Sequence, residues 1–222
     1  MAKPLIPREE YFYKNIKNTP LCQCLPIFLG STVYEDKKWL ILQDLTANMS
    51  SPCIADIKLG TRSFEVDVSQ EKANRQFSHI FNTTTASYAI RCIDICIRRN
   101  GEVVHHWDRK EGRQMTAKKF AHVLKTFLNG KRRTQFVRAI KNISKKLKET
   151  QAILPNMRLY SASVLAVYDG DDDEAPMNVK LIDFAHAYLD VEAEGGNSKD
   201  TSYDDNSIKG LKNLINFVNS DN

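Results

Sequence analysis

The sequence predicts an α+β protein in two lobes. Three observations support this class: β-type segments dominate the first half after one short helix, two amphipathic helices fill the middle, and a hairpin and a last helix follow. The 222 residues, with 42% apolar content, suit one large domain or two small lobes that bury a real core. The chain shows no internal repeats.

The first half is expected to contain one helix and then mainly strands. Residues 7–18 begin with proline and carry acids in the first turn, which predicts a short helix. A strand should run to Gly30, and after a polar turn a second strand should cover Trp39–Leu42. Residues 51–60 predict a third strand, which Gly60 ends.

The second half should alternate between helices and hairpins. Ser69 resembles an N-cap and predicts a helix through residue 82. The expected elements after it are a hairpin over 86–107, helices over 116–130 and 134–154, two β-type segments at 158–170 and 178–189, and a last amphipathic helix over 207–220.

Charge and cysteine content limit the function classes. The net charge is +5, and residues 117–148 contain eleven Lys or Arg, whereas 169–174 and 190–205 are acidic, so an anionic partner is plausible: nucleic acid, a lipid surface or a polyphosphate. No apolar run approaches the roughly 20 residues that span a bilayer. The N-terminal residues lack a secretory signal pattern and the five cysteines form no C-x-x-C pair, so we expect reduced thiols and a cytoplasmic or nuclear protein.

The stretch SPCIADIKLGTR, residues 51–62, places an acid and a base on one apolar strand. Asp56 and Lys58 are two residues apart, and such residues point to the same face of a strand. Because charged side chains are rarely buried without a partner, the two residues either form a structural ion pair with each other or bind a charged ligand.

A second informative stretch, KLIDFAHA at 180–187, ends an apparent strand with one acid. Asp183 either binds a metal, since Mg²⁺ prefers one or two carboxylates plus substrate phosphates, or caps the following turn. His186 is either a phosphate contact or a core histidine. The chain has no G-x-x-x-x-G-K-[ST], no G-x-G-x-x-G and no H-R-D…D-F-G pair, which disfavours P-loop enzymes and standard protein kinases.

The combination of motifs nevertheless resembles one family. PCIADIKLG fits the P-x-x-x-D-x-K-x-G signature of the inositol polyphosphate kinases. YSASVLAVYDG, LIDFAH and IKGLKNLINFV resemble later segments of that family, and KPLIPREEYFY and WLILQDLT resemble those around its nucleotide lysine and hinge. GTR, SQEKANRQ and TTTASYAIR look most similar to the inositol hexakisphosphate kinases. The segments occur in the family's order over nearly the whole chain.

The resemblance implies a two-lobed, protein-kinase-like fold with ATP in the cleft between the lobes. The N-terminal, nucleotide-binding lobe would cover 1–45, and the C-terminal lobe 46–222, with an inositide-binding helix at about 62–85. Since the family has strands before the position of Lys3, the chain is expected to be either a minimal copy or one that lacks an N-terminal segment.

The resemblance also implies roles for single residues. Asp56 and Lys58 would be catalytic, Asp56 beside the nucleotide ribose or the acceptor and Lys58 on the transferred or substrate phosphate. Asp183 would hold Mg²⁺. The remaining assignments are Lys3 on the ATP phosphates, Gln43 and Leu45 at the adenine hinge, and His186 on the inositol phosphate.

Lys72, Arg75 and His79 lie at helical spacing and are the candidates for the inositide pocket; the alternative is a solvated helix face. An inositol with six phosphates carries roughly −9 to −12, which demands such a cationic site. The chain departs from the family at Gln43, where an acid is common, and at Lys110 and Glu111, where tyrosines are common. An adenine contact that relies on backbone groups, and an altered substrate edge, are therefore expected.

The resemblance favours transfer of the γ-phosphoryl group of ATP to inositol hexakisphosphate, with Mg²⁺ as cofactor. The nearest alternative is a multikinase or trisphosphate kinase that acts on lower inositol phosphates, and one enzyme could do both. A nucleic-acid or membrane-surface binding module is less favoured, because Phe120, Phe127 and Phe136 occupy core-like helical positions rather than exposed stacking positions. We expect a monomer that binds no nucleic acid and inserts into no membrane.

Overall fold

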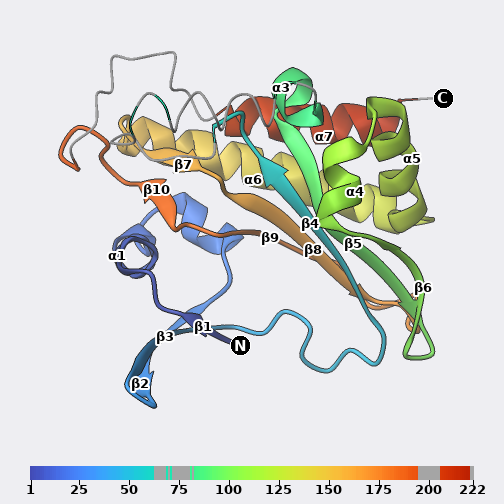
Figure 1. Ribbon diagram of the computed structural model, residues 1–222, viewed down its shortest axis with the longest axis horizontal. Helices are drawn as coiled ribbons and strands as arrows, with labels where there is room; N and C mark the ends of the chain where they lie inside the picture. Colours follow the sequence, from blue (N-terminus) through green and yellow to red (C-terminus); the bar gives the residue numbers. More distant parts are fainter. Residues whose placement is uncertain (63–68, 70, 72–80, 82, 195–205, 221–222) are drawn as a thin grey trace.

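The computed structural model of the chain describes residues 1–62, 69, 71, 81, 83–194 and 206–220. The strands of this part form a three-stranded sheet in the order β1-β3-β2, a five-stranded sheet in the order β6-β5-β4-β8-β9 and a two-stranded sheet of β10 and β7. All pairs are antiparallel. In Figure 1 the helices α5, α6 and α7 lie above the five-stranded sheet and the three-stranded sheet lies below it.

The three-stranded sheet consists of β1 (Ala2–Pro4), β2 (Phe28–Tyr34) and β3 (Lys37–Leu42). The prediction that Gly30 ends a strand is wrong. Gly30, at φ 125°, lies at a register shift inside β2, and the strand continues to Tyr34. The turn lies at Glu35 and Asp36, which both have positive φ, as the tight two-residue hairpin turns require.

The five-stranded sheet has β4 (Pro52–Leu59) at its centre, between β5 (Ile90–Arg99) and β8 (Ser163–Asp169). Its outer strands are β6 (Glu102–Trp107) and β9 (Asn178–Ile182). Burial alternates strictly along β4: Cys53, Ala55, Ile57 and Leu59 are buried, whereas the residues between them are half-buried. One face of β4 therefore belongs to the core, and the other presents Asp56 and Lys58.

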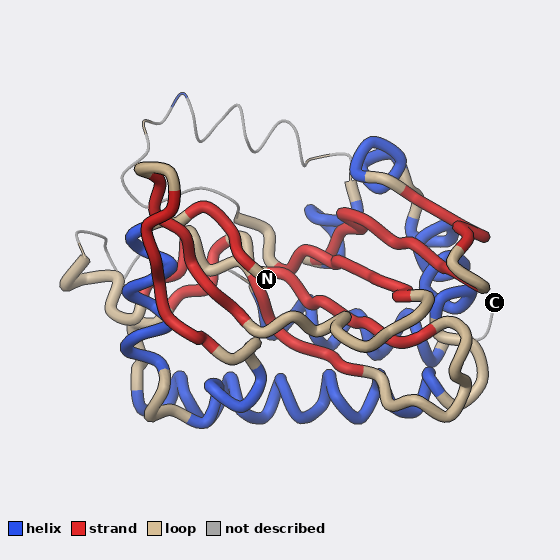
Figure 2. The backbone as a smooth tube through the Cα atoms, turned by 90° about the horizontal axis from the view of Figure 1, so that it is seen from below, coloured by secondary structure: helices blue, strands red, loops and turns tan. Residues whose placement is uncertain are grey.

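Three helices cover the core face. They are α5 (Ala117–Phe127), α6 (Arg132–Ile153) and α7 (Ser207–Asn219), and the long α6 runs along one side of the sheets in Figure 2. Phe120, Phe127 and Phe136 are 0% exposed, so the aromatic side chains of the basic segment 117–148 belong to the core. In the described part of the chain, no helix combines the length and apolar character that a membrane span requires.

Two predicted β segments are each broken by a bend. The segment 158–170 divides at Ser161, with φ 65°, into β7 (Arg158–Tyr160) and β8; the segment 178–189 divides at Asp183, with φ 64°, into β9 and β10 (His186–Tyr188). Ser163 pairs with Ile182 and Tyr160 pairs with His186, so both strands leave the five-stranded sheet at matched positions. Asp183 consequently lies at a corner of the fold.

The N-terminal helix α1 (Pro7–Ile16) packs against this corner. Phe12 stacks on Phe184 with ring centroids 4.3 Å apart, and Tyr13 contacts both Phe184 and Phe28.

Three short helices were not predicted: η1 (Pro20–Cys24), α3 (Thr84–Tyr88) and α4 (Arg109–Gln114). The predicted helix from Ser69 lies almost wholly outside the described residues. All five cysteines are free thiols.

Candidate active site

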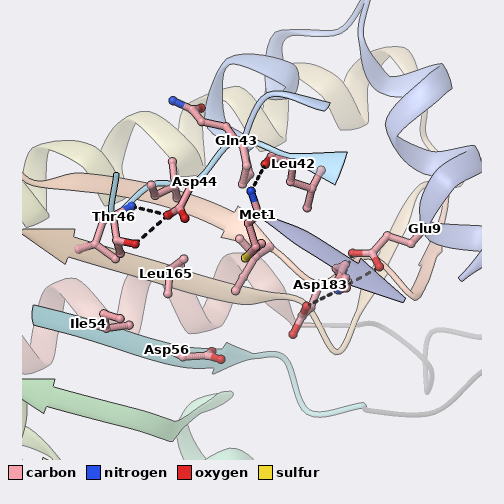
Figure 3. A pocket seen from close by; sticks show the side chains of 15 residues that line it. Met1, Glu9, Leu42, Gln43, Asp44, Thr46, Ile54, Asp56, Leu165 and Asp183 are labelled. Atoms are coloured by element: carbon pink, nitrogen blue, oxygen red, sulfur yellow. Dashed lines mark hydrogen bonds and ion pairs between the residues drawn. The ribbon is translucent and has the colours of Figure 1, made fainter. Parts of the chain in front are cut away.

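A pocket of about 450 Å³ lies between the three-stranded and five-stranded sheets (Figure 3). The hinge segment after β3, the corner after β9 and the half-buried face of β4 all contribute to its walls. All five residues predicted to bind the nucleotide line this pocket: Lys3, Gln43, Leu45, Asp56 and Asp183. These residues are spread over most of the sequence, and the fold brings them together.

The pocket is apolar in the middle and polar at two opposite sides. Ile54, Leu165, Val167 and Ile182 of the five-stranded sheet face Leu42 and Met1 across it. Figure 3 shows Asp44 and Thr46 on one side, with Glu9 and Asp183 on the other. An apolar slot with polar groups at its ends is the usual form of a small-molecule site, and this one has the size of such a site.

The hinge side is fixed by hydrogen bonds to the chain before β2. The backbone N–H of Gln43 donates to the Ile27 carbonyl at 2.8 Å, and the Gln43 side-chain oxygen accepts from the Ile27 N–H at 3.3 Å. The side-chain oxygen of Gln43 is thus engaged in a hydrogen bond with the backbone of Ile27. Asp44 and Thr46 also line the pocket, although the sequence did not indicate them. Asp44 Oδ1 accepts hydrogen bonds from the Thr46 backbone N–H at 2.9 Å and from the Thr46 hydroxyl at 2.7 Å.

The opposite side is built around Lys3. Its Nζ lies 3.0 Å from Asp183 Oδ1 and 3.0 Å from Glu9 Oε2. Burial opposes the charge of Lys3, but Asp183 and Glu9 outweigh that effect and raise the pKa of the lysine. Glu9 is 0% exposed, and its Oε1 also accepts from the Phe184 N–H at 3.2 Å. Glu9 was not singled out from the sequence, and it anchors both Lys3 and the corner beside Asp183.

Asp183 has the features of a metal-binding carboxylate. Its side chain is 48% exposed in the pocket, its Oδ1 contacts Lys3, and its backbone is held at φ 64°. Residues held in sparsely populated backbone regions concentrate at functional sites. Mg²⁺ commonly takes one or two protein carboxylates plus substrate phosphates, so the Asp183 carboxylate in the pocket suits that ion.

Asp56 faces the same space. Burial raises the pKa of its carboxyl to about 6, and the negative charge of Asp183 contributes, while a hydrogen bond from Ser163 and the charge of Lys58 act in the opposite direction. Its Oδ1 is buried and has no hydrogen-bond partner in the described structure. A buried, unpaired carboxylate oxygen beside a second carboxylate is an arrangement that a divalent cation would stabilise.

The other predicted site residues lie elsewhere. Lys58 follows Asp56 on the same face of β4, just beyond the pocket lining, and burial followed by the charge of Arg91 lowers its pKa. His186 is half-buried on β10, beyond the corner, and is not among the residues that line the pocket. Lys72, Arg75 and His79 lie outside the described residues.

Comparison with known proteins gives a consistent result. A family profile described as "Inositol polyphosphate kinase" matches residues 39–219. Inositol hexakisphosphate kinase 1 of Saccharomyces cerevisiae is 32% identical over 169 residues, which is 70% of this chain and 16% of that protein. Inositol hexakisphosphate kinase 3 of Mus musculus is 29% identical over 221 residues, which is 86% of this chain and 53% of that protein. The chain spans about half or less of the length of these relatives.

Solved structures share the fold over nearly the full chain. The inositol phosphate multikinase Ipk2 of S. cerevisiae, in complex with ADP and Mn²⁺, superimposes with a TM-score of 0.74 and 26% identity, covering 98% of this chain and 97% of that one. A second inositol phosphate multikinase structure, at 22% identity, has a TM-score of 0.68 and shows the fold alone. The predicted fold and the family resemblance are confirmed.

Proposed function

Because the chain belongs to the inositol polyphosphate kinase family, we propose that it transfers the γ-phosphoryl group of ATP to an inositol phosphate. The observation that carries the proposal is the convergence of five predicted nucleotide-site residues on one pocket between the two sheets. ADP and a divalent metal in the Ipk2 structure support a nucleotide and a metal as ligands of this chain.

The geometry suggests how the chain would position the nucleotide. The adenine ring would occupy the apolar slot between Leu42 and the residues of β4 and β8, with hinge backbone groups as partners, because the Gln43 side chain is committed to Ile27. The phosphates would extend toward Lys3 and Asp183. Glu9 would act as a positioning residue that keeps Lys3 aimed at them.

Phosphoryl transfer requires positioning and charge neutralisation more than covalent chemistry. Mg²⁺, held by Asp183 with Asp56 nearby, would supply part of that neutralisation. Lys3 would bind the nucleotide phosphates, and Lys58 would meet the transferred phosphoryl group on the far side of Asp56. Burial raises the pKa of Asp56 to about 6 in the ligand-free chain, and a bound cation would stabilise its ionised form.

For the acceptor we propose inositol hexakisphosphate, with a diphosphoinositol phosphate as product. Support comes from two similar relatives, which are named inositol hexakisphosphate kinases. The structural similarity to a multikinase favours lower inositol phosphates as the alternative. Lys72, Arg75, His79 and His186 remain the predicted inositide contacts from the family resemblance.

Product analysis with ATP, Mg²⁺ and separate inositol tris-, pentakis- and hexakisphosphates tests the proposal. A diphosphorylated product from the hexakisphosphate is the expected result. No transfer to any acceptor would refute the kinase function, and transfer to the lower phosphates alone would refute the choice of acceptor while leaving the kinase function intact.

Asp183→Asn should reduce Mg²⁺-dependent turnover by at least about 100-fold, since loss of one electrostatic contact at a transferring group commonly costs 10²–10³ in rate. The fold should be unaffected because the side chain is half exposed. Steady-state kinetics with a thermal unfolding control gives the measurement. Asp36→Asn, in the β2–β3 turn, is the matched control and should keep full activity. An active Asp183→Asn enzyme would exclude the metal role.

A further inference from the structure

The charges of the chain are unevenly divided between the helices α5, α6 and α7 and the rest of the sequence. These three helices contain twelve Lys or Arg and one acid, Glu149. The whole chain contains 32 Lys or Arg and 27 Asp or Glu, so twenty cations and twenty-six acids lie outside the three helices. The net charge of +5 therefore combines helices at +11 with a remainder at −6.

The outer side of α6 carries a stripe of cations. Four exposed residues follow one another at spacings of three, four and three: Arg138, Lys141, Lys145 and Lys148. With 3.6 residues per turn, they lie within an arc of about 80° and extend over about 15 Å of the helix. The buried residues of α6 lie on the other side of the helix and include Phe136, Ile140, Ile143 and Leu147. The stripe therefore points away from the core.

The neighbouring helices add cations to the same side of the molecule. Helix α7 contacts both α5 and α6, and all three helices lie in one layer on the core face of the five-stranded sheet (Figure 1). Lys209 and Lys212 on α7 and Lys118 on α5 are exposed, and the helical period places them opposite the buried residues of their helices. The outer helical face consists of these exposed cations: Lys118, Arg138, Lys141, Lys145, Lys148, Lys209 and Lys212.

The stability of the fold does not account for the outer helical face. Lys145 Nζ lies 3.8 Å from Glu149 Oε1, and Oε2 of the same carboxylate lies 3.0 Å from Lys146 Nζ. No carboxylate of the described residues forms an ion pair with the other six cations. Like charges three or four residues apart destabilise a helix. The face therefore lowers stability slightly, and an anionic partner would relieve its repulsion.

We propose that the outer helical face docks the chain on an anionic lipid bilayer. Each Lys or Arg held near such a surface contributes about 1 kcal/mol, or about fivefold in affinity, so several together bind without an inserted segment. A layer of helices that lies against a sheet presents its cations side by side, which suits a planar partner. This inference does not depend on the proposed kinase function.

The composition of the face favours lipid headgroups over nucleic acid. Six of its seven cations are lysines, which act as point charges, whereas arginine supplies the planar fork that nucleic-acid recognition uses. Phe120, Phe127 and Phe136 are 0% exposed, so α5 and α6 offer no phenylalanine on which a base could stack. All three helices pack against the sheet, and none projects as a helix that enters a groove must.

Docking through this face leaves the nucleotide pocket accessible. The helices cover the core face of the five-stranded sheet, whereas Ile54 and Asp56 on the other face of β4 line the pocket. The bilayer and the pocket would thus lie on opposite sides of this sheet. A docked chain can still exchange water-soluble ligands with its surroundings.

Vesicle sedimentation of the whole chain tests the proposal. Phosphatidylcholine vesicles that contain phosphatidylserine are compared with pure phosphatidylcholine vesicles at about 0.1 M salt. The wild type should bind the vesicles with phosphatidylserine and not the pure phosphatidylcholine vesicles. Arg138→Gln/Lys141→Gln/Lys148→Gln should weaken this binding at least about tenfold, because it removes three cations that have no described ion-pair partner.

The matched control removes the same charge from exposed positions of α1 and β3: Lys17→Gln/Lys37→Gln/Lys38→Gln. It should bind within about twofold of the wild type, and both variants should keep the wild-type unfolding temperature. A wild type that fails to bind phosphatidylserine would overturn the proposal. Equal losses in the two variants would do so too, because binding would then follow net charge alone. Tighter binding of single-stranded RNA through the same three residues would assign the face to nucleic acid and refute the lipid partner.

Discussion

Asp56, a proposed site residue, lowers stability through its buried charge. Burial raises the pKa of its carboxyl to about 6, from an ordinary value of 3.8, and Asp183 adds repulsion. The folded chain therefore binds the Asp56 proton more tightly than the unfolded chain does. Between pH 4 and 6 the folded state holds more protons, so stability falls as the pH rises through this window, and the loss is complete above it.

Asp56→Asn should accordingly stabilise the ligand-free protein at pH 8 by about 1–3 kcal/mol, because one pKa unit corresponds to about 1.36 kcal/mol. The gain should shrink as the pH falls to 4, where the wild-type carboxyl is protonated in the folded state, and should vanish at still lower pH, where it is protonated in both states. Denaturant unfolding at the two pH values gives the measurement. A variant that is less stable than the wild type at pH 8 would contradict the assigned ionisation. Kinase activity of this variant should be lost at both pH values.

Elements with a repeating local pattern were predicted well. The strand expected over residues 51–60 is β4, Pro52–Leu59, because apolar and polar residues alternate along it. The bend at Asp183 was not predictable, since a left-handed residue other than glycine leaves no periodic signal and is imposed by the pairing of β7 with β10. Helix α4 was missed because its six residues contain a glycine whose role depends on a contact with β5.

The residues of the candidate site divide in the same way, into those that a local pattern indicates and those that depend on distant contacts. Lys3, Asp56 and Asp183 could be located through short motifs, and the structure places them around one pocket. Glu9 could not be located from the sequence, because an acid in the first turn of a helix is ordinary. Its burial depends on its contacts with Lys3 and with the backbone of Phe184, which lies far along the chain.

Gly112→Ala tests the seating of α4 on β5. The added methyl group cannot fit 2.2 Å from a backbone oxygen, so α4 must shift, at a cost of about 1–3 kcal/mol. Gln114→Ala, an exposed change on the same helix, is the control and should alter the free energy of unfolding by less than about 0.5 kcal/mol. Equal stabilities for the two variants would show that α4 is not held by this contact.

At the scale of the whole molecule, an ion-pair network connects the three-stranded sheet with the corner that follows β9 of the five-stranded sheet. Lys3 belongs to β1, Glu9 to α1, and Asp183 to the corner after β9. The aromatic contacts of Phe12 and Phe184 reinforce this junction. Lys3, Glu9 and Asp183 all line the pocket, so the geometry of the pocket depends on how firmly this network joins the elements around it.

Lys3→Met should destabilise the protein by about 2–4 kcal/mol, because it leaves the buried Glu9 without its cation and with the Phe184 N–H as its remaining donor. The double variant Lys3→Met/Glu9→Gln should recover part of the loss, since glutamine carries no charge. Chemical denaturation of the wild type, both single variants and the double variant completes the cycle. Additive effects of the two single changes would contradict the coupling.

The Lys3–Asp183 contact also has a consequence for biosynthesis. The two residues are 180 positions apart. At the usual rate of about 5–20 residues per second, roughly 10–40 s separate their appearance during translation. During that interval Glu9 has been synthesised, but Asp183 and Phe184, beside which it is buried in the folded chain, have not. The pocket is therefore expected to be completed late, when the residues up to the corner at Asp183 have been synthesised.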